Sequence, residues 1–202
     1  MDTPHRGPIP RNILIIQGHP DRAGGHLCHA FADTHAEGAV SAGHSVSRID
    51  AAAIDFPLLR TKAEFEAGRL PESLLDAKQA LQVADHIVII FPLWLGTMPA
   101  LLKGFLEHLM RPGIAFEYRS KGFPKKLLKG KSARLVVTMG MPALFYRWFY
   151  FSHGLRVLKR NILAFVGIRP VQESLFGMVE GASAETIASW LEQMRGLGAR
   201  AK

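Results

Sequence analysis

The segment His86–Glu107, HIVIIFPLWLGTMPALLKGFLE, decides the fold. Its first six residues, His86–Phe91, form an apolar run rich in β-branched side chains, which predicts a strand buried on both faces. The loop Pro92–Thr97 follows directly, and Pro99 then starts a predicted helix that runs to Met110. A buried strand that passes through a short loop into a helix is the repeating unit of parallel, helix-covered sheets.

Four further strands can be placed around this one by their apolar, β-branched runs. They are Asn12–Gln17, Ser45–Asp50, Ala133–Thr138 and Val171–Phe176. Helices are predicted between and after the strands, at Leu27–Ala42, Pro71–Ala84, Pro99–Met110, Leu144–Val166 and Ala184–Leu197. Strands that alternate with helices predict an α/β fold with a single doubly wound, five-stranded parallel sheet. A flavodoxin-like strand order, 2-1-3-4-5, and a Rossmann-type half are the two leading arrangements.

Length and composition set the limits of this prediction. A chain of 202 residues suits a single domain over 1–202, and the polar, proline-rich residues 1–10 are expected to form a loose tail. The chain has one cysteine, Cys28, so no internal disulfide can form, which fits a reducing compartment. No secretory signal or membrane-spanning run is visible. We therefore expect a cytoplasmic protein.

Positive charge is concentrated in one part of the chain. The formal net charge is +8, and residues 118–172 contain 12 Lys and Arg but no Asp or Glu. Such a span attracts anions, for example a nucleotide phosphate, an acidic lipid headgroup or nucleic acid, although an ordinary solvated face explains it equally well. No recognised nucleic-acid module accompanies the charge, so a nucleic-acid partner is not expected. Weak peripheral contact with a membrane remains compatible with it.

Several familiar motifs are absent or incomplete. No G-x-G-x-x-G follows the first strand, and Gly130-Lys131-Ser132 lacks the earlier glycine and the following helix of a phosphate-binding P-loop. No histidine pair has convincing metal-ligand spacing together with a carboxylate or thiolate, so no metal site is expected.

Ligands of open parallel sheets bind beyond the carboxyl ends of the strands. The relevant loops here are Gly18–His26, Pro92–Thr97 and Thr138–Tyr146. The first is a glycine-rich turn that enters a helix, so its backbone N–H groups lie at the positive end of the helix dipole. Residues placed to hold a phosphate there are Gly25, His26, Leu27 and Cys28. An ordinary strand-to-helix turn with a polar cap is the alternative.

The run PLWLGTMPALLKGF, residues 92–105, closely resembles the second flavin loop and following helix of the flavodoxin-like NAD(P)H:quinone oxidoreductases. Gly18-His19-Pro20 resembles the opening motif of that family, and Val137–Gly140 resembles its third flavin loop. The PGIAFEY segment, Pro112–Tyr118, resembles its G-x-x-F segment. The resemblance runs in order from about residue 12 to residue 168 and implies the flavodoxin-like strand order.

The resemblance also implies a set of cofactor-binding residues. The second loop would hold the isoalloxazine ring through its backbone, the third loop would border the ring, and the first loop would hold the phosphates, with His19 nearby. The residues of the second and third loops are Pro92, Leu93, Trp94, Leu95, Gly96, Thr138, Met139 and Gly140. In the first loop the family often has Ser or Thr, an aromatic residue and Asn, whereas this chain has His26, Leu27 and Cys28. This departure leaves the diphosphate contacts open, with FAD expected and FMN as the alternative.

Members of the family also use a Tyr and a His near the flavin, and Tyr146 and His153 are the matching candidates, with Tyr150 as a competitor. The neighbouring aromatic residues allow a different interpretation, a purely structural aromatic helix. If the resemblance holds, the chain is an NAD(P)H dehydrogenase (quinone), which passes hydride from NAD(P)H to flavin and then to a quinone-like acceptor by a ping-pong cycle, as a homodimer. The alternatives are a regulatory flavoprotein subunit of a membrane potassium-efflux system and a flavin electron carrier.

Overall fold

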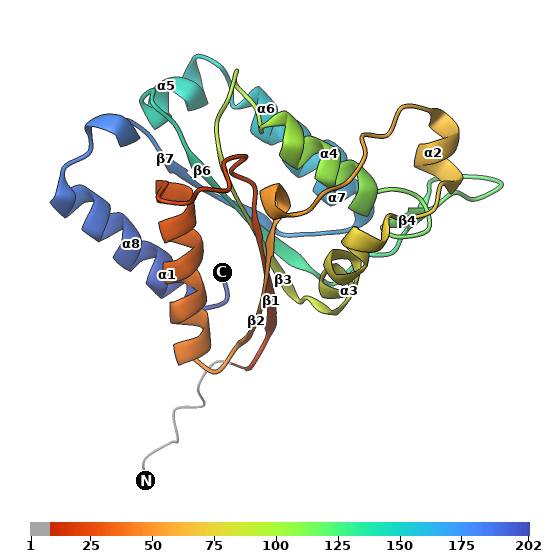
Figure 1. The fold of residues 1–202 in the computed structure, drawn as a ribbon, viewed down its shortest axis with the longest axis horizontal. Helices are drawn as coiled ribbons and strands as arrows, with labels where there is room; N and C mark the ends of the chain where they lie inside the picture. The colour runs from red at the N-terminus through yellow and green to blue at the C-terminus, as the bar shows by residue number, and fades with distance from the viewer. Residues whose placement is uncertain (1–8) are drawn as a thin grey trace, which may run out of the picture.

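The computed structural model describes residues 9–202, so most of the predicted N-terminal tail lies outside the described residues. Five strands form one parallel sheet in the order β2-β1-β3-β6-β7 (Figure 1). They are β1 Asn12–Gln17, β2 Ser45–Asp50, β3 His86–Pro92, β6 Ser132–Thr138 and β7 Val171–Phe176. In the order of the five predicted strands this is 2-1-3-4-5. The flavodoxin-like prediction is therefore confirmed, and the Rossmann-type half is excluded because β1 lies between β2 and β3.

Alternate residues of the inner strands face opposite layers. Ile13 and Ile15 of β1 pack with Phe31 of helix α1, Leu27–Ser41, and with helix α8, Ala184–Ala199. Leu14 and Ile16 face the other layer, which contains helices α3, Leu75–Val83, and α4, Ala100–Leu109. Figure 1 shows α1 and α8 side by side on one face and α3, α4 and α7 on the other. The two-sided burial explains why the inner strands are apolar throughout.

Three details differ from the sequence-based expectations. The segment predicted as irregular, residues 51–70, contains the short helix α2, Lys62–Ala67, capped by the Thr61 side chain. A small antiparallel pair, β4 Phe116–Glu117 with β5 Lys125–Lys126, was not predicted. The predicted helix over residues 144–166 is broken, because Phe151 and Ser152 take left-handed backbone angles with φ of 50° and 49°. Its pieces are α5 Ala143–Trp148, α6 His153–Arg156, the π-helical segment Val157–Leu163 and α7 Ala164–Val166.

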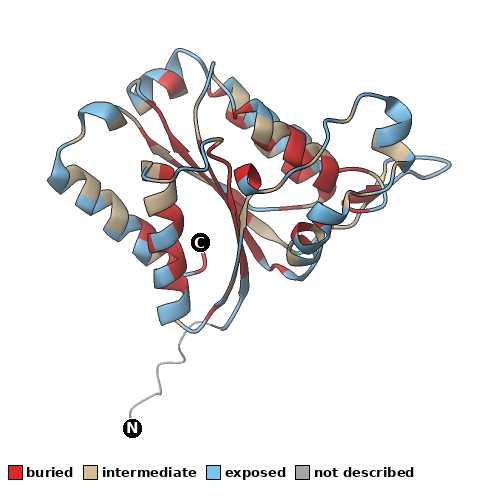
Figure 2. Ribbon diagram, in the orientation of Figure 1, coloured by how far each residue is buried: buried red, intermediate tan, exposed pale blue. Residues whose placement is uncertain are grey.

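Burial follows this layered arrangement (Figure 2). The central strands β1, β3 and β6 are buried almost along their whole length, whereas β2 at the edge is largely half-buried or exposed. In the part of the chain that the structure describes, no helix is long and apolar enough to cross a membrane.

Candidate functional site

The carboxyl ends of β1, β3 and β6 lie along one edge of the sheet, which we call the rim. The loops that leave them touch one another. The Leu93 N–H of the second loop donates to the Thr138 carbonyl of the third over 2.8 Å. The Thr138 hydroxyl lies 3.3 Å from the sulfur of Cys28, the second residue of the helix after the first loop. The rings of His19 and Trp94 meet edge-on at 6.5 Å. The structure therefore brings the three predicted loops together.

The first loop presents a row of backbone donors. Helix α1 starts at Leu27 with the extended residue His26 as its N-cap, and no side chain caps it. Within the described residues, the N–H groups of Gly25, His26, Leu27 and Cys28 make no hydrogen bond. A helix N-terminus with unsatisfied N–H groups is an anion site, because the dipole adds to the donors. The four residues thus lie where a phosphate would be bound.

Two imidazoles stand in this loop. His26 stacks on His19 with ring centroids 3.9 Å apart, and its Nε2 lies 2.8 Å from the Asp21 carboxylate. The His19 Nδ1 accepts the Asp21 N–H over 3.2 Å. Burial, followed by the charges of His26 and His29, lowers the pKa of His19. Because Nδ1 is an acceptor, the neutral His19 ring carries its proton on Nε2.

The second loop has fewer available donors than the resemblance implies. Pro92 has no N–H, the Leu93 N–H is used in the bond to the third loop, and the Trp94 N–H donates to the Thr97 carbonyl over 2.9 Å. Within the described residues, the N–H groups of Leu95 and Gly96 have no acceptor. These two groups are the donors that the loop offers to a ligand.

Leu95 and Gly96 also carry the unusual conformation of the loop. Both have left-handed angles, with φ of 48° and 80°, and the Leu95 side chain is fully exposed. A branched residue in this region costs of order 1 kcal/mol or more and persists only where the surroundings impose it. Trp94 is half-exposed beside it. Strain and exposed apolar surface coincide here, which is typical of a ligand-binding loop.

Tyr146 and Gly154 both pack against the Gly96 carbonyl of the second loop. Tyr146 is only 1% exposed, and its hydroxyl donates to the Gly96 carbonyl over 3.0 Å. Burial raises the pKa of this hydroxyl. A Cβ at Gly154 would lie 2.3 Å from the same carbonyl oxygen, so only glycine allows the start of α6 to approach so closely. Tyr146 therefore contacts the predicted flavin loop rather than the solvent.

His153, the other catalytic candidate, is exposed, and its ring lies 5.9 Å from that of Phe151. It belongs to an exposed aromatic surface on and after α5. Phe145 and Phe149 stack at 4.8 Å in this surface. Its members are Leu144, Phe145, Trp148, Phe149, Tyr150 and Phe151, each between 44% and 72% exposed.

The third loop contributes mainly backbone. The Thr138 and Met139 side chains are 5% and 3% exposed, and the Met139 N–H donates to the Phe176 carbonyl over 2.9 Å. Gly140 is exposed at the rim. A Cβ there would meet Glu180, from the loop after β7, at 3.6 Å. Gly140 is therefore the part of this loop that is open to a ligand.

Three residues of the rim were not singled out in the sequence. Asp21 orients His26, Gly154 packs on the second loop, and Gly177 lies so close to the third loop that a Cβ would be 2.4 Å from the Ala143 nitrogen. Isolated glycines at a strand end or inside a helical pattern signal close backbone approach, so Gly154 and Gly177 carried a readable signal. Asp21 carried no such sequence signal, because its contact with His26 is formed only in the folded loop.

The rim fits a flavin nucleotide on these observations. The donors of Gly25–Cys28 match an anionic phosphate, and the N–H groups of Leu95 and Gly96 match the carbonyl and ring-nitrogen acceptors of isoalloxazine. Trp94 and Leu95 add exposed apolar surface for a flat ring. Within residues 9–202, no group of three or more His, Cys, Asp or Glu side chains is arranged to hold a metal ion.

Comparison with known proteins agrees with this geometry. The model of a family described as flavodoxin-like fold matches residues 11–197. The chain is 31% identical to the FMN-dependent NADH:quinone oxidoreductase 2 of Rhizobium etli, over 80% of this chain and 83% of that protein. It is 26% identical to the protein of the same name from Halalkalibacterium halodurans, over 91% of this chain and 96% of that protein.

A solved structure, the NAD(P)H:quinone oxidoreductase from Methanothermobacter marburgensis, superposes with a TM-score of 0.80 at 22% identity, over 96% of this chain and 100% of that one. With several other curated relatives the chain aligns over only 41% to 54% of their length. The family match, in contrast, includes all five strands and the three rim loops. This chain belongs to the flavodoxin-like fold family.

Proposed function

We propose that this chain is a flavin-dependent NAD(P)H:quinone oxidoreductase, which transfers hydride from NAD(P)H to a quinone-like acceptor by a ping-pong cycle. One observation carries the proposal. The uncapped start of α1 and the strained turn Leu95–Gly96 lie on adjoining loops of the same rim. Together they offer donors for a phosphate and donors for a flat ring.

Each part of the rim has a distinct task. The N–H groups of residues 25–28 bind the flavin phosphate, and the His19 Nε2–H is a further donor beside them. The Leu95 and Gly96 N–H groups orient the ring and stabilise negative charge on it. Bound flavin supplies the hydride chemistry. Trp94 contributes an apolar wall that excludes water from the acceptor.

FMN fits the first loop better than the FAD expected from the sequence. The relatives named above are called FMN-dependent. The side chains of this loop are already engaged with each other, with Asp21 bound to His26 and the His26 ring stacked on His19. One uncapped helix start serves one phosphate well. The basic span 118–172 favours NADPH over NADH through its 2′-phosphate.

We assign Tyr146 a positioning role and His153 a role in balancing charge as hydride reaches the flavin ring. The Tyr146 hydroxyl is bound to Gly96 and buried, whereas His153 is exposed among aromatic side chains. An imidazole can accept or release a proton, so the His153 ring can balance charge during hydride transfer. His153→Gln should slow flavin reduction and leave flavin affinity unchanged. Equal reduction rates in stopped-flow for the variant and the parent would contradict this role.

The exposed aromatic surface after α5 also favours a homodimer. Contiguous apolar patches on a monomer mark an interaction site, and a second copy would cover Trp148 and Phe149. Sedimentation should show a dimer, and Trp148→Ser should weaken it. For the location we propose the cytoplasm. We also propose weak membrane contact through residues 118–172, which pelleting with liposomes at low salt would measure.

The decisive experiment is an absorption spectrum of the purified protein, followed by chromatography of the released chromophore. We expect a yellow protein that releases FMN and reduces menadione with NADPH or NADH. A protein that stays colourless after incubation with FMN and FAD would refute flavin binding. A yellow protein without menadione reductase activity would instead favour the regulatory or electron-carrier alternatives.

A further inference from the structure

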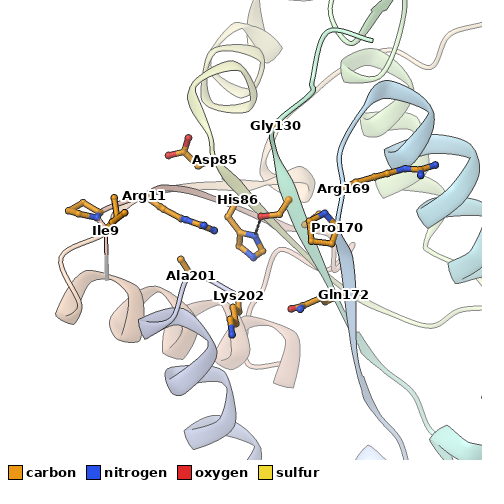
Figure 3. A pocket seen from close by; sticks show the side chains of 13 residues that line it. Ile9, Arg11, Asp85, His86, Gly130, Arg169, Pro170, Gln172, Ala201 and Lys202 are labelled. Carbon is orange, nitrogen blue, oxygen red and sulfur yellow. Dashed lines mark hydrogen bonds between the residues drawn. The ribbon is translucent and has the colours of Figure 1, made fainter. Parts of the chain in front are cut away.

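A cavity of about 500 Å³ lies at the edge of the sheet opposite the rim. It opens at the amino ends of β1, β3, β6 and β7, beside the last residues of the chain (Figure 3). Its border carries the cations Arg11, Arg169 and Lys202, with Ser132 and His86 deeper in the sheet. None of the flavin-binding residues proposed above belongs to it.

His86 forms the floor of this cavity. Figure 3 shows its ring among the lining side chains, with Arg11 extending toward it. His86 is 2% exposed, and its Nδ1 lies 2.8 Å from the Ser132 hydroxyl. Within residues 9–202, its Nε2 is buried without a hydrogen-bond partner. Burial, followed by the charges of His35, Arg134 and Arg11, lowers the pKa of His86 to about 3. The ring is therefore neutral, and Nε2 carries a proton if the hydroxyl donates to Nδ1.

Arg134 is a buried cation on the same strand as Ser132, two residues farther along β6. It is 7% exposed and donates to the Ser174 hydroxyl over 2.8 Å and to the side chain of Gln172, a residue that lines the cavity. Its Nε has no partner, and none of the carboxylates in the described part of the chain forms an ion pair with it. A buried charge without a counter-ion is costly, because it has lost its hydration. An anion nearby would offset that cost.

The charges around the cavity are unbalanced. Among the described residues, Arg11, Arg169 and Lys202 also form no ion pair. One carboxylate side chain stands at the border, that of Asp85. Asp85 accepts the Asn12 N–H over 2.8 Å. Arg11, Arg134 and Lys202 outnumber the Asp85 carboxylate around a buried imidazole nitrogen that has no partner within residues 9–202, which matches an oxyanion, since charge-assisted bonds to such groups are strong.

We propose that this cavity is a second ligand site, which binds a small oxyanion, such as a phosphate or carboxylate group, between Arg11 and His86. The anion accepts from the Arg11 guanidinium and, once the covering side chains shift, from the His86 Nε2–H. It also balances the charge of Arg134. The proposal does not depend on flavin binding, because the site and the rim lie at opposite ends of the strands.

The test is a titration of the full-length protein with inorganic phosphate, and separately with citrate, at constant ionic strength set with chloride. The ring ¹⁵N resonances of histidine are followed by NMR, with melting temperature as a second measurement. We expect the His86 resonances to shift and the protein to melt higher, both with and without FMN. A response to both probes indicates general oxyanion binding, and a response to one identifies the preferred group.

Arg11→Gln is the diagnostic variant, because Arg11 is exposed and, within residues 9–202, its side chain makes no hydrogen bond or ion pair, whereas its backbone bonds to His44 and Ser45 are kept in the variant. It should weaken phosphate binding about tenfold, as expected for the loss of one charge-assisted contact. Arg119→Gln, which removes an exposed cation elsewhere, is the matched control and should bind as the parent does. The proposal would be overturned by any of three results. The His86 resonances could stay unchanged throughout, the shifts could be confined to His19 and His26, or both variants could bind phosphate with equal affinity.

Discussion

Tyr146→Phe should loosen the second loop of the rim while leaving the core packed. The hydroxyl is the only group removed, and it donates to the Gly96 carbonyl over 3.0 Å from a side chain that is 1% exposed. The phenyl ring still fills the same space. The backbone at Leu95 and Gly96, with φ of 48° and 80°, then loses one of the contacts that hold it.

The magnitude follows from the burial of this bond. A neutral hydrogen bond contributes about 1 kcal/mol, and a carbonyl left without a partner costs about 1–3 kcal/mol. The Gly96 carbonyl is in a half-buried residue and is partly rehydrated, so we expect a loss of about 1–2 kcal/mol. For a chain of this size that corresponds to a fall in melting temperature of roughly 2–8 °C. If the loss acts on the bound conformation, flavin affinity falls about 5- to 30-fold.

Two measurements check this reasoning. Differential scanning calorimetry of the flavin-free protein reports the loss of stability, and quenching of FMN fluorescence reports the affinity. Tyr150→Phe is the matched control, because Tyr150 lies in the same segment, is 44% exposed and makes no hydrogen bond through its hydroxyl within the described residues. If Tyr146→Phe melted and bound FMN like this control, the hydroxyl would not position the loop.

Three further predictions concern packing, pH and reactivity. Gly154→Ala should lower the melting temperature, because the added Cβ would lie 2.3 Å from a backbone carbonyl oxygen. Gly181→Ala is the control and should not lower it, because a Cβ there would meet no atom within 4 Å. Equal melting temperatures of the two variants would contradict the close approach at Gly154. Burial lowers the pKa of His35 to about 4 and of His86 to about 3, so the unfolded chain binds more protons below the ordinary value of 6.5. The contribution of these two histidines to the free energy of unfolding should thus be complete above pH 6.5. As the pH drops toward 4, the free energy of unfolding should fall by on the order of 1.4 kcal/mol per pH unit for each histidine. Urea unfolding that is unchanged between pH 7 and pH 5 would contradict this. Burial raises the pKa of the Cys28 thiol to about 11, so at pH 8 it should react with a thiol reagent only after denaturation.

The sequence by itself determined the alternation of strands and helices along the chain, whereas the pattern alone left two strand orders open. The apolar runs of β1, β3 and β6 predict buried parallel strands, and the structure places those strands within one residue of their expected ends. Helix starts were readable at Pro99 and at the glycine-rich turn before Leu27, since proline fixes φ and glycine adopts the positive φ angles of tight turns. Such signals act over a few residues, which is why they survive in the sequence alone.

The tertiary structure decided how the rim works. Tyr146 and Leu93 were predicted near a ligand, and the structure adds that the Tyr146 hydroxyl and the Leu93 N–H donate to the carbonyls of Gly96 and Thr138. The Arg134 Nε and His86 Nε2 atoms, which are buried without a partner in the described part of the chain, could not be found from the sequence either, because their surroundings come from segments far away in the chain. Hydrogen-bond satisfaction and burial are properties of groups that meet only on folding. A local sequence pattern therefore cannot predict which hydrogen-bond donors remain without a partner in the folded chain.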